Sequence, residues 1–320
     1  MKSFTATSND AGKRLDKFIQ RAAPGLPISL MYRYLRTKRI KVNNKKCDCA
    51  YRLAEGDVID MYIGDEFFTG NKFQYDFLKA GTELNIIYED KNILLLDKKA
   101  GVLCHPDKTE YVDTLITRVH RYLYEKGEYN PGSEVTFTPA LANRIDRNTG
   151  GIVIAAKNAE ALKILNEKIK NREIIKKYLC VTVGTPKETQ GIIRSYLKKD
   201  EKTNMVRVFD SPAEGSRESV TRYTVLDTKN NLSLVEAQLL TGRTHQIRAQ
   251  LAHIGAPLLG DTKYNPGNKN KALRGQLLYS YKLKFEFTQD AGILNYLNGK
   301  EFEVRDVWFR EDFYNGKLKG

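Results

Sequence analysis

One carboxylate of the chain stands between two arginines, directly ahead of an apolar run. Residues 143–151 read NRIDRNTGG and continue as IVIAAK, which places Asp146 between Arg144 and Arg147. Nearby cations favour the ionised form of a carboxyl group, so Asp146 is a candidate nucleophile rather than a general acid. The two glycines that end the segment allow a tight turn before the apolar strand, which would present Asp146 at a strand edge.

A second segment gathers cationic and amide side chains. Residues 239–264 read LLTGRTHQIRAQLAHIGAPLLGDTKY and hold Arg243, His245, Gln246 and Arg248 between an expected strand and an expected helix. Such groups can hold a carboxylate together with a polar or anionic ligand. Taken alone, the first segment could be a surface ion-pair cluster and the second a capped helix start. Their occurrence together behind a basic N-terminal region favours a functional site.

The positive charge of the chain is concentrated near its N-terminus. The 320 residues carry a net charge of +14, with an isoelectric point near 9.4. Residues 12–46 hold eleven Lys and Arg against one Asp, so they carry +10 of this total. An excess of this kind indicates a polyanionic partner, with nucleic acid favoured over a membrane surface. A solvated basic face is the alternative reading of an isolated charge run.

The basic residues are interleaved with a helix, helix, strand, strand pattern. Apolar residues recur at helical spacing in two short stretches, the second preceded by Ser29 as an expected N-cap. RIKVNN then predicts a strand ending in an Asn43-Asn44 turn, and GDVIDMYI predicts a second strand. Residues 65–81 have no sustained period, and we interpret them as a linker partly packed through its aromatic residues.

The remainder of the chain predicts an α+β fold. Strands are expected at LNIIYED, NILLLDK, GIVIAAK, KKYLCVTVG, RYTVLD and LSLVEAQLL, and helices at 113–126 and at AEALKILNEKIKN. Strands outnumber helices without alternating regularly with them, which indicates a mixed, largely antiparallel sheet rather than a doubly wound fold. The usual ATP, dinucleotide and zinc-protease signatures are absent from the sequence.

Cysteine content and hydropathy narrow the class of protein further. Four cysteines are too few for a disulfide framework, and no second pair stands at zinc-finger spacing, so we expect reduced, mostly buried thiols and no metal. No apolar stretch approaches the roughly 18 residues that would span a bilayer. We therefore expect a cytoplasmic protein.

Two parts of the chain resemble known families. Residues 14–63, with the RLDKFI opening and the IKVN turn, resemble the small RNA-binding module named after a ribosomal small-subunit protein. Residues 84–320 resemble the catalytic domain of the RluA-type pseudouridine synthases, through YEDKNILLLDKKAG, NRIDRNTGG, KKYLCVTVG and TGRTHQIRAQLAHIGAPLLGD. The chain departs from the family pattern at Lys99, Asn143, Gly150 and Gln250, where the family has proline, histidine, serine and frequently histidine.

The resemblance implies a fold, an activity and a set of site residues. It implies a small α/β RNA-binding module at residues 1–64, a linker at 65–81 and a pseudouridine-synthase-like catalytic domain at 82–320. Uridines in structured RNA would be isomerised without a cofactor or metal, with large-subunit ribosomal RNA favoured over transfer RNA and the protein a monomer. A glycosidase, a non-catalytic RNA-binding protein and a synthase acting on transfer RNA are the alternatives.

The site residues follow from the same resemblance. Asp146 would be the essential carboxylate, either attacking the sugar carbon or removing a proton from its neighbour. Arg243 would pair with Asp146, and Tyr178 would lie against the target base. The substrate would also contact Arg144, His245 and Arg248, around the flanking phosphates, and Leu278. RNA phosphates would meet the cations of the N-terminal module: Arg33, Arg36, Lys38, Arg39 and Lys41.

Overall fold

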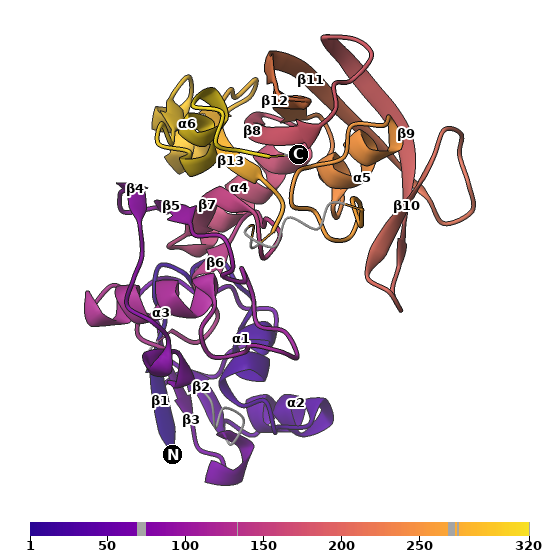
Figure 1. Ribbon diagram of the computed structural model, residues 1–320. Helices are drawn as coiled ribbons and strands as arrows, with labels where there is room; N and C mark the ends of the chain where they lie inside the picture. The colour runs from indigo at the N-terminus through magenta and orange to yellow at the C-terminus, as the bar shows by residue number, and fades with distance from the viewer. Residues whose placement is uncertain (69–74, 133, 268–272, 274, 320) are drawn as a thin grey trace. The chain divides into compact units, whose positions relative to one another are not determined.

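The computed structural model describes residues 1–68, 75–132, 134–267, 273 and 275–319 (Figure 1). Contacts divide the chain into two compact units that do not follow chain order. The first comprises residues 1–83, 106–140 and 156–162, and the second residues 84–105, 141–155 and 163–320. The boundaries drawn from the sequence at residues 64 and 81 stay a prediction. No helix of the described residues is long and apolar enough to cross a membrane.

The N-terminal module (residues 1–64) is a three-stranded sheet with two helices. Its elements are β1 (Lys2–Thr5), α1 (Leu15–Ala22), α2 (Ile28–Arg36), β2 (Ile40–Val42) and β3 (Val58–Met61). The strands pair antiparallel in the order β1-β3-β2. Leu15, Phe18 and Ile19 of α1 and Met31 and Leu35 of α2 are buried in one core with Ile40 and Ile59 of the sheet. The helical spacing of the apolar residues is confirmed.

The expected start of α2 is wrong by two residues. The helix begins at Ile28, and its N-cap is Pro27, with φ −59° and ψ 139°, rather than Ser29. The proline ring fixes φ near the value found at this N-cap, and Pro27 has no side-chain oxygen that could cap the helix. Ser29 therefore lies inside the first turn of the helix.

The expected linker is partly packed through its aromatic residues, as the sequence predicts. The short 3-10 helix η1 (Asp65–Phe68) places Phe67 and Phe68 against the core of the N-terminal module. A second one, η2 (Asp76–Lys79), buries Phe77 and contacts α3 (Leu115–Glu125). Residues 69–74 of this stretch lie outside the described residues.

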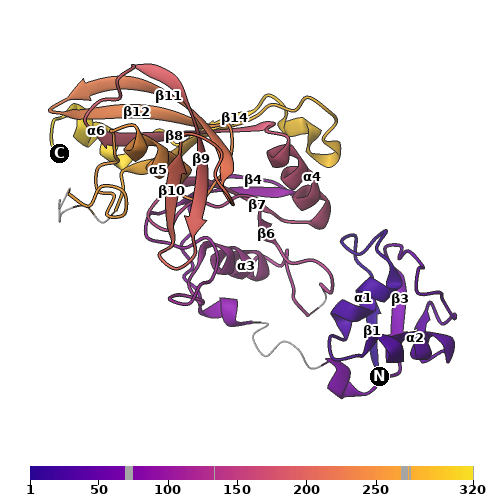
Figure 2. The same ribbon diagram turned by 90° about the vertical axis from the view of Figure 1, so that its right-hand side faces the viewer.

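The second unit is built on one large mixed sheet (Figure 2). Its strands follow the order β10-β9-β11-β12-β8-β13-β7-β5-β4, with β14 beside β13 and β6 beside β7. Neighbouring strands from β10 to β13 pair antiparallel, as do β13 with β14 and β4 with β5, whereas β13 pairs with β7 in parallel. The α+β class with a largely antiparallel sheet is confirmed. The strands are β4 (Ile86–Glu89), β5 (Ile93–Lys98), β6 (Ala140–Leu141), β7 (Gly150–Ala156), β8 (Ile174–Val183), β9 (Gln190–Asp200), β10 (Met205–Phe209), β11 (Arg217–Lys229), β12 (Leu232–Leu239), β13 (Leu278–Phe285) and β14 (Glu301–Glu303).

The two faces of this sheet have different covers. Leu179 and Val181 of β8 belong to an apolar cluster with Phe309 and Phe313 of α6 (Trp308–Tyr314). The alternate residue Tyr178 points to the other face, because successive side chains of a strand alternate. That face carries α5 (Gln246–His253), which packs on β9, β10 and β11. Helix α4 (Ala159–Lys170) and the 3-10 helix η3 (Gly292–Leu297) complete the fold.

Candidate active site

The loop that carries Asp146 is fastened to the end of β5. Lys98, 1% exposed, donates from Nζ to the backbone oxygens of Lys99, Val102 and Arg147 at 3.0, 2.7 and 3.0 Å. The N–H of Gly101 donates to the same Arg147 oxygen at 2.8 Å. Burial lowers the pKa of Lys98 to about 8, although Cys104 and Asp146 partly oppose this. One buried ammonium thus holds the residue that follows Asp146.

The glycines after the loop allow two strands to approach closely, which is more than the tight turn expected from the sequence. Gly151 has φ +111°, and a Cβ there would lie 2.2 Å from the backbone oxygen of Ser280. A Cβ on Gly150 would lie 2.5 Å from the Tyr279 ring. These glycines form the parallel pairing of β7 with β13. The strand edge that presents Asp146 therefore requires residues without side chains.

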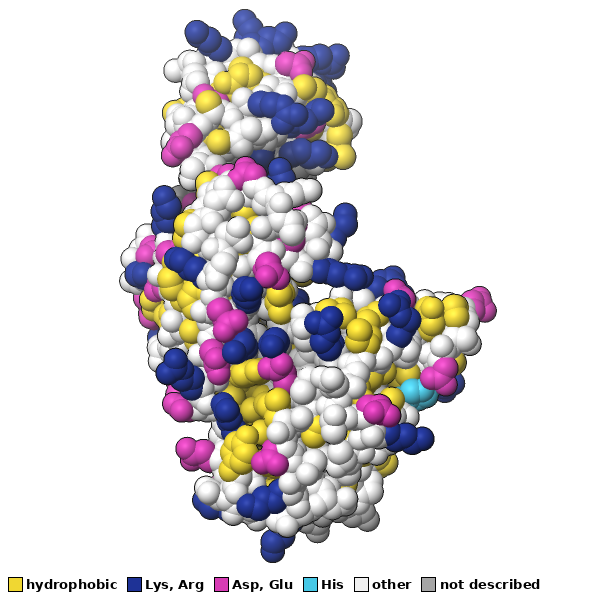
Figure 3. Space-filling view, turned by 90° about the horizontal axis from the view of Figure 1, so that it is seen from above, with side chains coloured by type: hydrophobic (Ala, Val, Ile, Leu, Met, Phe, Trp, Pro, Cys, Tyr) yellow, Lys and Arg dark blue, Asp and Glu magenta, His cyan; other side chains and the backbone are white. Residues whose placement is uncertain are grey.

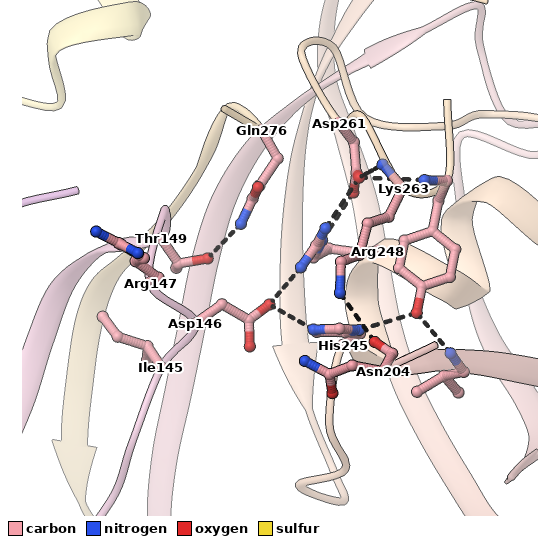
Figure 4. A network of polar contacts seen from close by, with 12 residues as sticks. Ile145, Asp146, Arg147, Thr149, Asn204, His245, Arg248, Asp261, Lys263 and Gln276 are labelled. Atoms are coloured by element: carbon pink, nitrogen blue, oxygen red, sulfur yellow. Dashed lines mark hydrogen bonds and ion pairs between the residues drawn. The ribbon is translucent and has the colours of Figure 1, made fainter. Parts of the chain in front are cut away.

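Asp146 shares an arginine with a second, buried carboxylate (Figure 4). Nη1 of Arg248 donates to Oδ2 of Asp146 at 2.9 Å, and Nε and Nη2 donate to the two oxygens of Asp261 at 2.7 and 2.9 Å. Burial opposes the charge on both buried groups, yet their hydrogen bonds hold the pKa of Asp261 below and that of Arg248 above its usual value. The planar guanidinium is thereby fixed in orientation as well as charge.

His245 faces the same oxygen of Asp146 from another side. Its Nε2 lies 3.9 Å from Oδ2, and its Nδ1 lies 2.9 Å from the hydroxyl oxygen of Tyr264. Burial lowers the pKa of His245 to about 4, although Asp146 opposes the shift. The imidazole is therefore neutral near pH 7. No donor among the described residues reaches Oδ1 of Asp146, which is left open.

Two glutamines fix the helix that supplies these groups. Nε2 of Gln246 donates to the hydroxyl of Thr221 at 2.8 Å, and that hydroxyl donates to Oε1 of Gln250 at 2.6 Å. Gln250 also donates to Ser195 Oγ and to the Ser219 oxygen at 2.9 and 3.0 Å. The amide that replaces a frequent family histidine therefore ties α5 to β9 and β11.

Tyr178 is buried on the sheet face that carries α5. It pairs with Ser280 of β13 and Ala237 of β12 in the registers of β8. Burial raises its pKa, and a hydrogen bond with the Ser280 side chain offsets this in part. The Asp146 charge also acts on the hydroxyl.

The expected pairing of Arg243 with Asp146 is wrong. Arg243 is exposed, and its Nε donates to the Glu218 oxygen at 3.3 Å. It precedes α5, whereas Arg248 lies in the first turn of the helix. Arg248, which is expected near a phosphate, binds two carboxylates in the structure, and its contact with a phosphate stays a prediction.

Other expected residues keep positions compatible with a substrate. Arg144 is exposed beside Asp146. Leu278 is buried at the start of β13, opposite Cys180. Arg147 is exposed, and its Nε donates to the Gly101 oxygen at 3.1 Å.

Comparison with known protein families identifies the fold that holds this constellation. The family model described as RNA pseudouridylate synthase matches residues 92–253. The chain belongs to the RNA pseudouridylate synthase family. A second model, the S4 domain, matches residues 13–59 of the N-terminal module. The protein is therefore an RNA pseudouridine synthase, an isomerase of uridine in RNA, with an RNA-binding S4 module.

Several pseudouridine synthases resemble this one along most of their length. An uncharacterised RNA pseudouridine synthase of Mycoplasma genitalium is 33% identical over 88% of either chain. Ribosomal large subunit pseudouridine synthase C of Rickettsia typhi is 30% identical over 80% of this chain and 82% of its own. The structure of human RNA pseudouridylate synthase domain containing 4 covers 74% of this chain and 94% of its own, with a TM-score of 0.56 and 19% identity. This last likeness concerns the fold alone.

The S4 module presents the cations expected to meet RNA. Arg33, Arg36, Lys38 and Arg39 are exposed, and Lys41 is half-buried. The Arg39 guanidinium lies 5.2 Å from the centre of the Tyr34 ring and Lys41 Nζ lies 5.3 Å from that of Tyr62. Lys and Arg side chains gather on this module, the lobe at the top of Figure 3. Aromatic rings thus support two cations at its surface.

Sequence reasoning missed several residues of the pseudouridine synthase site. Lys98, Asp261 and Tyr264 all lie within the motif segments, but none was assigned a role. A buried lysine or aspartate is rare unless it is paired, so a charge within an apolar strand was a usable signal for Lys98. Asp261 and Tyr264 gave no such signal, since nothing in the pattern of residues 239–264 shows which of its polar side chains are buried together.

Proposed function

We propose that this pseudouridine synthase modifies particular uridines of large-subunit ribosomal RNA, with Asp146 as the reactive carboxylate. The reaction breaks the bond between ribose and N1 of uracil and joins ribose to C5. The hydrogen on C5 leaves as a proton, and N1 gains one, so the reaction is redox-neutral. These steps need a carboxylate at the sugar and a support for the base after it leaves its stack.

The arrangement around Asp146 carries the proposal. Oδ2 faces Arg248 at 2.9 Å and His245 at 3.9 Å. Oδ1 meets no donor from the described residues and is free to approach the sugar. An arginine that is itself held by buried Asp261 keeps this carboxylate in one orientation. Both roles of Asp146, attack on the sugar carbon and removal of a neighbouring proton, use the free oxygen.

Tyr178 and Leu278 would form the support for the base. They lie on neighbouring strands, β8 and β13, and both are buried. The Tyr178 ring offers an aromatic face to a base that has left its stack. Arg144, exposed next to the loop, would then meet the backbone of the flipped nucleotide.

Substitution of Asp146 tests the mechanism. Asp146→Asn keeps the shape of the side chain and removes the anionic group, so turnover should be abolished while folding and RNA affinity stay nearly unchanged. The assay is release of tritium from RNA that carries uridine labelled at C5. Asp210→Asn, at an exposed aspartate, is the matched control. Product formation at the normal rate by Asp146→Asn would exclude this mechanism.

The relatives support ribosomal RNA as the target. Those from three Rickettsia species and Haemophilus ducreyi carry the name ribosomal large subunit pseudouridine synthase C. Mapping pseudouridines in cells that lack this protein tests the proposal. We expect a loss confined to large-subunit ribosomal RNA, whereas a loss in transfer RNA would overturn it. Monomeric behaviour, expected from the sequence, is checked by light scattering on the purified protein.

A further inference from the structure

We propose that Tyr264 is a positioning residue of the active site, which donates its hydroxyl proton to Nδ1 of His245 and so places the imidazole N–H on Nε2, facing Asp146. Tyr264 was not among the residues expected from the sequence. The proposal rests on Asp146 being the reactive carboxylate, as proposed above. Its direct test, the position of the His245 proton, does not depend on activity.

The hydrogen bonds at the Tyr264 hydroxyl determine where its proton goes. The backbone N–H of Val206 donates to this oxygen at 2.8 Å. The other contact of the oxygen is Nδ1 of His245, at 2.9 Å. Within the described part of the chain, Nδ1 is the one acceptor that the hydroxyl proton can reach. The arrangement in which both groups find partners has the proton on Oη and a lone pair on Nδ1.

The opposite side of the imidazole gives the same answer. Nε2 lies 3.9 Å from Oδ2 of Asp146. A proton on Nε2 turns the positive end of an N–H dipole toward the carboxylate, while the other tautomer would turn a lone pair toward it. The ring is neutral near pH 7, because burial lowers the pKa of His245 to about 4. Asp146, Arg248, Lys263 and Asp261 are the charged groups that act on it.

The backbone holds the ring in this position at some cost. His245 has φ +52°, in the left-handed region, just before the first residue of α5. A residue with a side chain persists there only when its surroundings determine its conformation. The Tyr264 ring packs edge-on against the imidazole, with centres 5.7 Å apart, and also lies 5.3 Å from the Arg248 guanidinium. One tyrosine therefore contacts both groups that face Oδ2.

The bond to Val206 extends this contact to β10. Lys263, the residue before Tyr264, donates from Nζ to the backbone oxygen of Asn204 at 2.9 Å. Two adjacent residues thus fasten the turn before β10 and the start of β10 to the segment that holds Asp261 (Figure 4). The hydroxyl of Tyr264 is therefore fixed in space by backbone, which a positioning group requires.

The tautomer can be measured on the intact, unmodified protein. We would label the histidines with ¹⁵N and record long-range proton–nitrogen spectra near pH 7, identifying His245 by loss of its signals in His245→Asn. We expect Nδ1 to show the shift of an unprotonated nitrogen and Nε2 that of a protonated one. The opposite pattern overturns the proposal, whatever the role of Asp146.

A matched pair of substitutions tests the consequence for the reaction. Tyr264→Phe keeps the ring and removes the hydroxyl, and the single-turnover rate should fall roughly tenfold, as expected for one lost orienting hydrogen bond. RNA affinity should be unchanged. Tyr88→Phe, which removes a hydroxyl bonded to Asp90 at 2.8 Å on edge strand β4, should keep the normal rate.

A double-mutant cycle separates positioning from simple structural support. If Tyr264 acts through His245, Tyr264→Phe should have little further effect in a His245→Asn background, within about twofold. The pH profile of the single-turnover rate should also gain an inflection in Tyr264→Phe, because His245 loses the donor that favours its neutral form. An equal loss of rate in both backgrounds, with an unaltered pH profile, would show that Tyr264 only supports the fold.

Discussion

Asp146 has two oxygens with different surroundings, and Arg248 creates the difference. The guanidinium uses Nε and Nη2 for Asp261 and has Nη1 left for Oδ2 of Asp146. Because Asp261 is fully buried, it sets the plane of the guanidinium, which in turn sets the carboxylate. The orientation of the carboxylate proposed to react is thus set through Arg248 by a second, fully buried carboxylate.

Exchange of arginine for lysine at two positions distinguishes the structural partner from the one expected from sequence. Arg248→Lys should lower the single-turnover rate by at least about 100-fold, because an ammonium cannot serve two carboxylates with a planar fork. Arg243→Lys should keep the single-turnover rate within about twofold of normal, since Arg243 is exposed and its Nε bonds only to the backbone oxygen of Glu218 among the described residues. A larger loss in Arg243→Lys than in Arg248→Lys would contradict the pairing described above.

Lys98 predicts a loss of activity in mild alkali. Its pKa of about 8 is lowered by burial, so the ammonium becomes an amine with two protons for three carbonyl oxygens as the pH rises through 8. The loop of Asp146 should loosen, and the single-turnover rate should fall with an apparent pKa near 8.

In contrast to the single-turnover rate, the free energy of unfolding should gain from Lys98 as the pH rises above about 8. Between about 8 and the ordinary lysine pKa of 10.5, the unfolded chain binds one more proton at Lys98 than the folded chain. The contribution of this group to the free energy of unfolding therefore rises with pH there. Lys98→Met should have a low single-turnover rate, and its pH profile should lack the inflection near pH 8. Lys168→Met, at a buried lysine outside the loop, should keep this inflection. An inflection that survives in Lys98→Met would rule out this assignment.

At the scale of elements, the parallel pairing of β7 with β13 depends on glycine. Gly151→Ala would bring a Cβ within 2.2 Å of backbone at Ser280, where no rotamer change can relieve the contact. We expect a loss of more than about 4 kcal/mol in the free energy of unfolding, measured by denaturant titration. Gly299→Ala, at φ +79° with open space around it, should cost only about 1–2 kcal/mol from backbone strain. If both variants lost the same free energy of unfolding, the effect at Gly151 would come from its positive φ alone and not from contact with Ser280.

Local patterns predicted the elements well where apolar periodicity was strong. The runs of β5, β7, β8 and β12 and the helical spacing of α1 and α4 lie where the sequence placed them. The start of α2 was missed because Pro27 competes with Ser29 for the cap. The long β9, whose sequence QGIIRSYLKKD has no regular alternation of polar and apolar residues, and the short β10 were not individually predicted. Partners in the site could not be predicted, because Asp146 and Arg248 are 102 residues apart.

At the scale of the whole molecule, the charge is unevenly divided along the chain. The segment 12–46 carries +10 of the net +14, and its exposed cations belong to the S4 module. A triple variant with glutamine in place of Arg33, Arg36 and Lys41 should bind long RNA with a weaker salt dependence. We expect the slope of log affinity against log salt to fall by roughly 2.

Two controls keep this prediction specific. The first control is a triple variant with glutamine at three exposed lysines outside the S4 module, Lys163, Lys170 and Lys317. It should leave the salt slope nearly unchanged. Single-turnover rates at saturating RNA should be similar in both triple variants, because neither set touches Asp146. A full salt slope in the S4 variant would mean that phosphates are bound elsewhere.

Each of the two units is assembled from three separate segments of the chain. Residues 106–140 and 156–162 join residues 1–83 in one unit, while the segments between them belong to the other. Strand β13 pairs beside β7 although Ser280 and Ile152 are 128 residues apart. Such contacts depend on three-dimensional packing, which periodicity along a window cannot report.

The distance along the chain between Asp146 and its partners gives the protein an order of events during synthesis. The sheet and helices of the S4 module are complete once residue 61 has been made, so this module can fold early on the emerging chain. Asp146 can be oriented only after Arg248 and Asp261 have been made. Its loop also needs the β13 strand, which ends at Phe285. A nascent or truncated chain can therefore hold RNA while its carboxylate is still unaligned. We therefore expect a prematurely terminated chain to bind RNA without modifying it.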